Sequence, residues 1–483
     1  TYLLWRYPIK SVNGNHRMPT CPYRWPNGQG DVGKFLEGEK NNDIWRQRYG
    51  GIYRVWSGMN SERMLIFQPY RVLTRPEDIQ NVFADSDKHT KATNNNSGWL
   101  MGELLGKCVG LVSHSEWKSL RSITETPFLP NNMGSYIELI ERKTKRHFDD
   151  LFANGSLGQG ILNPVEDLKL LPFWIVAEIL YGELSVEMQQ TLENLIPLRE
   201  SLFRRIIGGG LTRFWWSRYL PISAIADLAK FKMEWSNFND LAYQNAERQS
   251  SRLPISYFYQ EIESGSMTRQ GMLQTLDEIL FANLDVTMGG ISWIFMFLGA
   301  YPELQTELRQ EVISHTSSES GKESEERYYL SKSTLLAASI LESSRLKPLA
   351  AFSIPQATPT DRIVGDFVIP AGTNFIVDSY ALNTYNAYWG KDNTEFRPDR
   401  FLERTAIKSR YNLWRFGFGP RNCMGKYLAD TMIRVLFAYI VENCQISLIT
   451  GKTSWKRNEK TWIMHPDTVL ICERLHNNEH LSK

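Results

Sequence analysis

The chain of 483 residues has few cysteines and almost no excess of charge of either sign. Its five cysteines are odd in number, widely scattered and without C-x-x-C spacing, which argues against a disulfide framework and against a zinc site. The formal net charge of +2 offers no field that would attract nucleic acid. These absences predict a protein of a reducing compartment with no nucleic-acid partner.

Long hydrophobic runs are also missing, because no segment has the ~18 consecutive apolar residues of a membrane-spanning helix. The first residues, Tyr2 to Pro8, nevertheless form an aromatic and basic cluster of the kind found at a membrane–water boundary. Two interpretations of this start stay open. It belongs to a soluble protein that has lost a tag or an initiator Met, or it is the stub of a removed membrane anchor.

What the chain does have is enough apolar sequence, 42%, to bury a large core. The first hundred residues contain β-rich runs, helical periodicity dominates from residue 113, and short strands return at 360–370 and 455–475. This order predicts a mainly α fold with small β-sheets, and a solvated loop at 317–327. The predicted helices are 116–124, 136–152, 172–181, 186–206, 222–249, 269–301, 302–314 and 333–346.

The most informative segment is FGFGPRNCMG, residues 416–425, which places one thiol in a glycine-framed loop just before a predicted helix. The unpaired N–H groups and the positive dipole end of that helix favour the thiolate form of Cys423. Gly417 and Gly425 allow the backbone to turn tightly and to approach a flat ligand. A lone cysteine is usually a small buried hydrophobe, but this spacing favours a metal-bound thiolate.

The same segment meets every fixed position of the pattern F-x-x-G-x-R-x-C-x-G, and it resembles the proximal haem loop of the cytochrome P-450 superfamily. The resemblance implies the cytochrome P-450 fold, a single large domain around a buried haem b. It also implies Cys423 as the axial ligand of the haem iron, and Phe416, Gly417 and Gly425 as residues that contact the cofactor.

Two further motifs precede the cysteine in the order that this family has. Glu342 and Arg345 lie three residues apart on one helical face, although an isolated E-x-x-R is more often a solvent-exposed pair. The segment FRPDRF, residues 396–401, resembles the family's P-E-R-F segment with Asp399 in place of Glu. The resemblance implies that Arg400 joins Glu342 and Arg345 in a structural network that fixes the segment before the cysteine loop.

The two propionates of a haem need donors at the edge of an apolar pocket. Trp117 and Arg121 match the family's W-x-x-x-R, which places an indole N–H and a guanidinium one helical turn apart. Taken alone, such a pair is more often a surface cation–π pair. The resemblance implies that both residues bind the propionates together with Arg421. By the family's layout, the walls of the substrate pocket come from residues 94–110, 203–216, 282–287 and 349–354.

The segment 277–293 resembles the oxygen-binding helix of the family, whose pattern A-G-x-(D/E)-T supplies an acid and an alcohol for proton delivery. Ala282 and Asp285 are in register with this pattern. Asn283 stands where glycine is expected, and Val286 takes the place of the threonine. The chain therefore departs from the family pattern at the position of the alcohol.

Thr287 lies one residue beyond the expected alcohol, rotated by about 100° on an ideal helix. Three explanations stay open: a π-bulge that re-aims Thr287, a water held by Asp285 and Asn283, or a hydroxyl or amine of the substrate. We take Asp285 and Thr287 as candidate catalytic residues, against the alternative that Asp285 is only a helix-surface acid. On this basis Asp285→Asn should lower turnover more than Thr287→Val does.

The resemblance predicts a haem-thiolate monooxygenase that activates O2 and oxidises an apolar or heteroaromatic small molecule. Because the chain shows no flavin or nicotinamide fingerprint, electrons must come from a partner. NADPH–cytochrome P-450 reductase is the candidate, with cytochrome b5 as a further donor. The pattern resembles fungal enzymes of secondary metabolism, and the run LDVT, residues 284–287, resembles enzymes that tailor diketopiperazine-type peptides.

Two alternative functions stay open. An enzyme of the same fold could use its oxidant for radical coupling, ring formation or desaturation without inserting oxygen, which the missing threonine allows. A non-catalytic haem-binding or sensing protein would also be compatible with the altered proton-delivery motif.

Resemblance to the microsomal branch of the family implies a place at the endoplasmic reticulum membrane, with the catalytic domain facing the cytosol. It favours the stub of a removed anchor within a linker at 1–25, followed by one catalytic domain at 26–483. The run Phe214-Trp215-Trp216, with Arg213 and Arg218, is expected to be an interfacial patch or, alternatively, packing under a lid.

Overall fold

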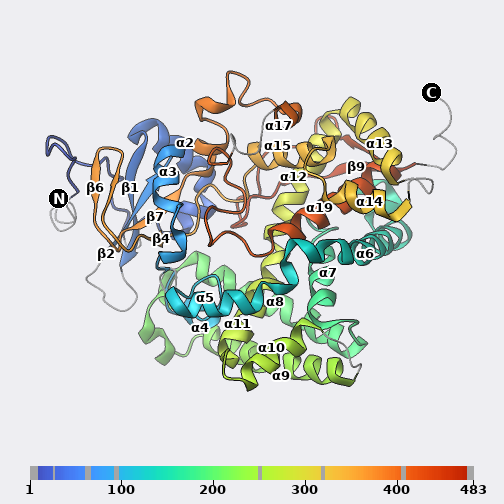
Figure 1. The fold of residues 1–483 in the computed structure, drawn as a ribbon, viewed down its shortest axis with the longest axis horizontal. Coiled ribbons are helices and arrows are strands. Elements are labelled where there is room, and N and C mark those ends of the chain that lie inside the picture. The colour runs from blue at the N-terminus through green and yellow to red at the C-terminus, as the bar shows by residue number, and fades with distance from the viewer. Residues whose placement is uncertain are drawn as a thin grey trace.

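Helices form most of the computed structural model, which describes residues 9–25, 28–59, 67–91, 97–248, 253–316, 321–403 and 410–475 (Figure 1). The prediction of a mainly α fold with small sheets is confirmed. The helices are α2 (Gly38–Tyr49), α3 (Pro76–Phe83), α4 (Trp99–Leu105), α5 (His114–Thr124), α6 (Met133–Asn154), α7 (Leu170–Tyr181), α8 (Val186–Gly208), α9 (Ser223–Arg248), α10 (Pro254–Glu263), α11 (Arg269–Phe281), α12 (Val286–Ala300), α13 (Pro302–Thr316), α14 (Gly321–Leu330), α15 (Leu335–Leu346), α16 (Ser379–Asn383), α17 (Asp399–Glu403) and α19 (Lys426–Asn443).

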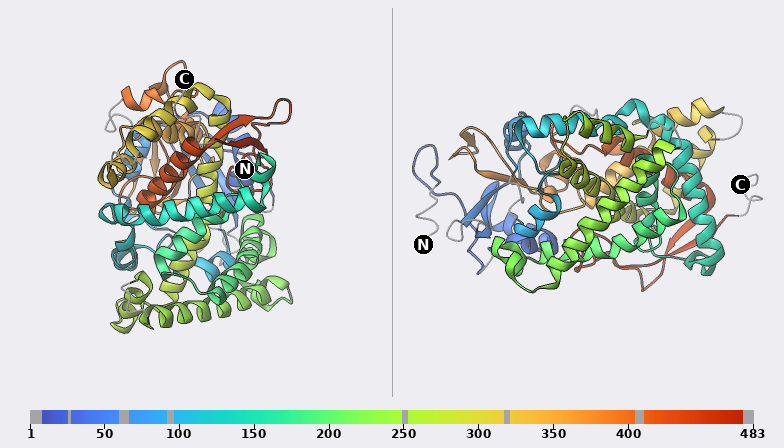
Figure 2. Two further views of the ribbon diagram at one scale, coloured as in Figure 1. Left: turned by 90° about the vertical axis from the view of Figure 1, so that its right-hand side faces the viewer. Right: turned by 90° about the horizontal axis from the view of Figure 1, so that it is seen from below.

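The strands form small sheets, and the largest of these lies at the end of the molecule that holds the N-terminus (Figure 1). In this sheet β1 and β2 are antiparallel, and β2 and β7 are parallel. The C-terminus lies at the opposite end of the long axis (Figure 2). The sheet orders are β1 (Ile52–Met59), β2 (Phe67–Leu73), β7 (Asn374–Val377), β4 (Gln356–Ala357); then β3 (Ile161–Leu162), β9 (Leu470–Arg474), β8 (Cys444–Leu448); and β5 (Arg362–Val364), β6 (Phe367–Ile369).

The main core lies among α6, α7, α11, α12 and α19. Helix α12 is apolar on nearly every side and is buried accordingly, because a helix without a polar face has no side to turn to water. It packs against α15 and β8, while α19 packs against α6 and α13. These two buried helices therefore give the segments around them a rigid frame.

Two sequence-based predictions of secondary structure are wrong in detail. The expected loop at 317–327 contains the start of α14, whose Tyr328 and Tyr329 are only 3% and 5% exposed. Burial of these two rings stabilises a helix that the polar composition of the segment does not predict. The single helix expected at 269–301 is interrupted between α11 and α12 by one 3₁₀ turn, η8 (Ala282–Leu284).

Among the described residues, one helical stretch, Arg269–Ala300, is long and apolar enough to cross a membrane. It comprises α11, η8 and α12, and 67% of its most apolar window is buried inside the protein. This degree of burial is that of a central core helix.

Candidate functional site

The cysteine loop is held in a tight conformation that only glycine permits at two of its positions. Gly417 and Gly419 have φ angles of 82° and 69°, in the left-handed region. A side chain on Gly419 would also collide with Ser86 and with the Phe83 carbonyl. The Cys423 N–H donates a 2.8 Å hydrogen bond to the Phe416 carbonyl, which closes the loop just before α19 begins.

Cys423 presents its thiol to a large interior cavity, whereas the other four cysteines are buried in the core. The cavity has a volume of about 460 Å³. Cys423 lies deep inside the protein at the cavity wall. Desolvation there raises the pKa of its thiol, while the Gly425 N–H and the positive charges of Arg121 and Lys426 lower it. The N–H donor and the positive charges around Cys423 therefore favour its thiolate form, which is the form that binds a metal cation.

The cysteine loop forms one wall of the cavity, and the interrupted central helix forms another. The helix lines the cavity with residues at positions i, i+1, i+4, i+5 and i+8 of one face. They are Ala282, Asn283, Val286, Thr287 and Gly290. Three of the four segments predicted to form pocket walls contribute lining residues, namely 94–110, 282–287 and 349–354, while none of the described lining residues comes from 203–216.

The position of Thr287 follows from this helical face. Thr287 lies beside Val286 on the cavity side, and its hydroxyl donates a 2.7 Å hydrogen bond to the Asn283 side-chain oxygen. Asn283 in turn donates to the Ile279 carbonyl at 2.6 Å. The interruption at η8 is a 3₁₀ turn and not the π-bulge considered from the sequence, and Thr287 needs no bulge to face the cavity.

Asp285 lies on a different side of the helix and is not among the residues that line the cavity in the described structure. Its carboxylate accepts a 2.8 Å hydrogen bond from the Trp462 indole N–H, and its carbonyl lies 3.1 Å from the His465 Nε2. Gly289 allows the segment that contains Trp462 and His465 to pack this closely against the helix, because a side chain at Gly289 would collide with Ile463. The C-terminal segment therefore fixes the helix at the position where it is interrupted.

Trp117 and Arg121 lie together at one edge of the cavity. The Arg121 guanidinium donates from Nε to Glu125 at 2.6 Å and from Nη1 to the Asn422 carbonyl at 3.1 Å. Trp117 is 6% exposed, and it is Arg421 that stacks on its ring, 4.7 Å from the ring centre. The pair is thus part of an interior wall and not an exposed cation–π pair.

Arg421 and Lys91 complete this cationic edge. Arg421 donates to the Val112 carbonyl at 2.6 Å, and burial lowers its pKa to about 10. Lys91 also lines the cavity, where burial and the charge of Arg421 lower its pKa to about 8. Buried cations that depress one another's pKa favour the binding of an anion between them. Lys91 belongs to no motif, and no sequence pattern indicates its place in this wall.

Glu342, Arg345 and Arg400 form a closed network with 0% exposure of each side chain. Arg345 binds Glu342 through two hydrogen bonds of 2.7 and 2.8 Å, and Arg400 binds the same carboxylate at 2.9 Å. Such a bidentate buried pair with a third partner keeps the carboxylate fully hydrogen-bonded. The three side chains for which the family resemblance implied a network therefore meet in the fold.

This network is linked to the cysteine loop through backbone contacts. Arg345 donates to the Asn383 carbonyl at 3.1 Å, and the Asn383 side chain exchanges hydrogen bonds of 3.0 and 2.6 Å with the Trp414 backbone. Arg415, the next residue, binds Ser344 at 3.1 Å and also pairs with Asp430 of α19. Both ends of the segment before the loop are therefore anchored.

The described residues contain no group of three or more His, Cys, Asp or Glu side chains placed to hold a metal ion. A metal at Cys423 would therefore need its remaining ligands from a non-protein group. The cavity fits a flat and mostly apolar group with an anionic edge, because Phe416 and Gly417 line it beside the thiol and three cations lie at one edge.

This combination of a mainly α fold, a glycine-framed cysteine loop and an interior cavity between that loop and an interrupted central helix is the architecture of a cytochrome P450. Residues 32–472 match the family model described as Cytochrome P450. The chain belongs to this family, and the haem-iron cofactor of the family is implied for it.

The relatives of the chain are fungal members of the family. The cytochrome P450 monooxygenase aclC of Aspergillus oryzae is 52% identical over 481 residues, which cover 99% of this chain and 96% of aclC. The monooxygenase asaD of Aspergillus flavus is 41% identical, over 98% of this chain and 90% of asaD. The monooxygenase gliC of Aspergillus fumigatus is 40% identical, over 98% of this chain and 92% of gliC. The chain is thus an oxidoreductase, and a non-catalytic sensing role is excluded.

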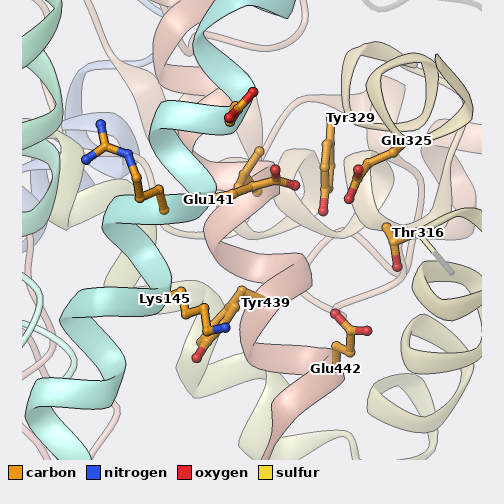
Figure 3. Close-up of a pocket in the computed structure, with 10 residues that line it drawn as sticks. Glu141, Lys145, Thr316, Glu325, Tyr329, Tyr439 and Glu442 are labelled. Atoms are coloured by element: carbon orange, nitrogen blue, oxygen red, sulfur yellow. The ribbon is translucent and has the colours of Figure 1, made fainter. Parts of the chain in front are cut away.

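A second cavity of about 330 Å³ lies between α6, α14 and α19, away from the cysteine loop (Figure 3). Glu141 of α6 and Glu325 of α14 point toward one another there, near Tyr329 (Figure 3). Burial and the neighbouring Glu325 raise the pKa of Glu141 to about 7. The two carboxyl groups therefore favour a state in which one of them is protonated.

Glu141→Gln is expected to stabilise the protein at pH 8 and to leave its stability nearly unchanged at pH 4.5. The folded-state pKa of Glu141 is raised above the value of the unfolded chain, so wild-type stability falls as pH rises from about 4.5 to about 7. We expect the variant to unfold on the order of 1 °C higher at pH 8, a small effect because solvent screens the partly exposed pair. Thermal unfolding measures this shift, and Glu193→Gln, an exposed carboxylate of α8 that does not line this cavity, should show none.

Proposed function

We propose that the chain is a haem-thiolate monooxygenase that uses haem b and inserts one oxygen atom of O2 into a small organic molecule. The observation that carries this proposal is the position of Cys423, whose thiol faces the cavity opposite α12. Family membership supports the cofactor, and the monooxygenase names of the relatives support the reaction.

In this proposal the Cys423 thiolate would hold the iron, and Phe416, Gly417 and Gly425, which line the cavity beside it, would lie against the cofactor. A bound haem supplies the one-electron chemistry that activates O2, with a thiolate favouring cleavage of the O–O bond. The buried network of Glu342, Arg345 and Arg400 (defined above) keeps the cysteine loop in one geometry.

Trp117, Arg121 and Arg421 are proposed to bind the propionates, with Lys91 as an additional donor. The support is geometric, because these side chains converge on one edge of the cavity and burial lowers the pKa of both Arg421 and Lys91. An anion placed between them would restore the solvation that burial removes.

Thr287 is proposed to deliver protons to the cavity beside the cofactor, and Asp285 to position the helix that carries Thr287. Thr287 lines the cavity, and its hydroxyl donates to the Asn283 side-chain oxygen, so rotation of the hydroxyl about its C–O bond would turn its proton into the cavity. Asp285 is turned toward Trp462, and its hydrogen bond to that residue positions the interrupted helix that carries Thr287.

Thr287→Val is expected to lower the product formed per NADPH consumed by about 3- to 10-fold, in line with the loss of one proton donor. Asp285→Asn should cost less than about 2-fold, because an amide oxygen can still accept the Trp462 N–H. This order is the reverse of the one expected from the sequence, since the structure turns only Thr287 toward the cavity. Thr287→Ser, which keeps the hydroxyl, is the control. A larger loss in Asp285→Asn would contradict these roles.

Electrons are proposed to come from NADPH–cytochrome P-450 reductase, with cytochrome b5 as a further donor. The support is that the sequence contains no flavin or nicotinamide fingerprint of its own. The relatives named above are fungal monooxygenases, which supports a role in fungal secondary metabolism, and a diketopiperazine-type peptide is the substrate proposed from the sequence.

A location at the endoplasmic reticulum membrane, with the catalytic domain (26–483) facing the cytosol and the linker (1–25) leading to an anchor, is also proposed. Leu211, Trp215 and Tyr219 support it, because these large apolar side chains are exposed together on the segment between α8 and α9. Arg213, by contrast, is buried and donates to the Ser57 carbonyl, so it is not part of that patch.

A same-fold oxidase that couples radicals, closes a ring or desaturates its substrate is the second candidate. Val286 in place of the family's threonine is compatible with it, because the chain lacks the alcohol at the position where the family pattern has one. Turnover under ¹⁸O2 separates the two candidates. One labelled oxygen in the product is expected for the monooxygenase, and an unlabelled product would show the oxidase.

A further inference from the structure

Glu278 is a carboxylate in the wall of the cavity that none of the roles above uses. It lies on α11 one helical turn before Ala282, so it belongs to the same face of the interrupted helix. Its Oε2 accepts a 2.9 Å hydrogen bond from the Gly110 N–H, and the Cys108 thiol is its second partner. A side chain on Gly110 would collide with the carboxylate, so glycine makes this close approach possible.

Glu278 has cations near it but none in contact. Among the described residues, no Lys, Arg or His nitrogen lies within 4.0 Å of its oxygens. Its charge nevertheless raises the pKa of Lys91, of Arg421 and of Cys423, so it acts on both the cationic edge and the thiol. A carboxylate has about four lone-pair positions, and the two known donors leave acceptor positions free on the cavity side.

We propose that Glu278 accepts a hydrogen bond from an N–H group of the substrate and so fixes which face of the substrate meets the cofactor. This inference rests on the proposed function. An apolar pocket that encloses an amide N–H must offer it an acceptor, and Glu278 provides a charged one. The ligand class is an N–H donor, such as a secondary amide.

The test compares matched pairs of ligands on the purified holoprotein. A cyclic dipeptide with two secondary amides is titrated beside its N,N′-dimethyl derivative, and indole beside N-methylindole, following the low- to high-spin absorbance change of the haem. We expect at least one N–H ligand to bind the wild type about 10-fold or more tightly than its methylated partner. In Glu278→Gln the amide oxygen can still accept the N–H but without the charge. Because a charge-assisted hydrogen bond is roughly twice as strong as a neutral one, the preference should shrink to about 3-fold, with the methylated ligand bound as before.

Glu278→Asp keeps the charge but shortens the reach, and it should lose the preference as well. Glu263→Gln makes the same charge change on the exposed end of α10 and should leave the preference intact. The inference is overturned by a wild type that responds to no N–H ligand or does not distinguish the members of a pair. It is also overturned by a Glu278→Gln variant that keeps the full preference or weakens both members equally.

The carbon monoxide complex of the reduced protein is measured on the same samples. A thiolate spectrum without ligand discrimination would refute the role of Glu278 alone and leave the proposed function standing. Loss of the thiolate spectrum from the wild type would refute the proposed function itself.

Discussion

Cys423→Ser is expected to reduce reductase-dependent product formation to less than about one-thousandth of the wild-type rate, which corresponds to about 4 kcal/mol in the activation barrier. A serine hydroxyl stays protonated in this site and cannot replace a thiolate as an electron donor to the iron. The loop itself should survive the change, because its conformation depends on the Cys423 N–H, the left-handed glycines and the start of α19.

The measurement is product formed per minute with reductase and NADPH, normalised to folded protein. Cys472→Ala serves as the control, since Cys472 is buried in β9 away from the cavity and should affect stability more than turnover. Retention of more than about a tenth of wild-type activity in Cys423→Ser would contradict the assignment of the axial ligand.

Glu342→Gln is expected to destabilise the fold by about 3–5 kcal/mol, because it leaves two buried guanidinium groups without their shared counter-charge. A typical domain has only about 5–15 kcal/mol of stability, so most of the protein should fail to accumulate as a haem complex. The large loss of stability is expected because all three side chains of the network are 0% exposed, so water cannot solvate the charges left unpaired.

Haem content of the purified variant and its thermal unfolding measure this effect. Glu403→Gln removes the carboxylate of an exposed pair with Arg397 and should change stability by less than about 1 kcal/mol. Equal behaviour of the two variants would contradict the view that the buried network maintains the cysteine loop.

The sequence could predict those parts of the site whose residues are neighbours in the chain. Cys423, Phe416 and Gly417 belong to one loop, and Glu342 and Arg345 to one helical turn, so spacing alone identifies them. The meeting of Glu342 with Arg400 was predictable only through the family resemblance, because the two residues are 58 positions apart.

Other features depend on contacts that no local pattern encodes. The hydrogen bond between Asp285 and Trp462 joins residues 177 positions apart, and it turns the acid away from the cavity. Lys91 meets Arg421 only in the folded chain. Glu278 could have been found by counting back one helical turn from Ala282, since both occupy the same face.

For secondary structure as well, elements set by a local sequence pattern were predicted, and one set by long-range contacts was missed. Helices with a clear apolar stripe, such as α6 and α8, lie within a few residues of their predicted bounds. Helix α14 was missed because its stability comes from burying two tyrosines against other helices, which the polar sequence of the segment does not reveal.

The central claim is that Cys423 binds haem iron as a thiolate in the cavity between the cysteine loop and α12. The absorbance spectrum of the reduced carbon monoxide complex tests it most directly, because a thiolate opposite carbon monoxide shifts the main haem band strongly to longer wavelength. We expect that shifted band in the wild-type holoprotein and its absence in Cys423→Ser. A wild type that binds haem without the shifted band, or a Cys423→Ser variant that keeps it, would contradict the claim.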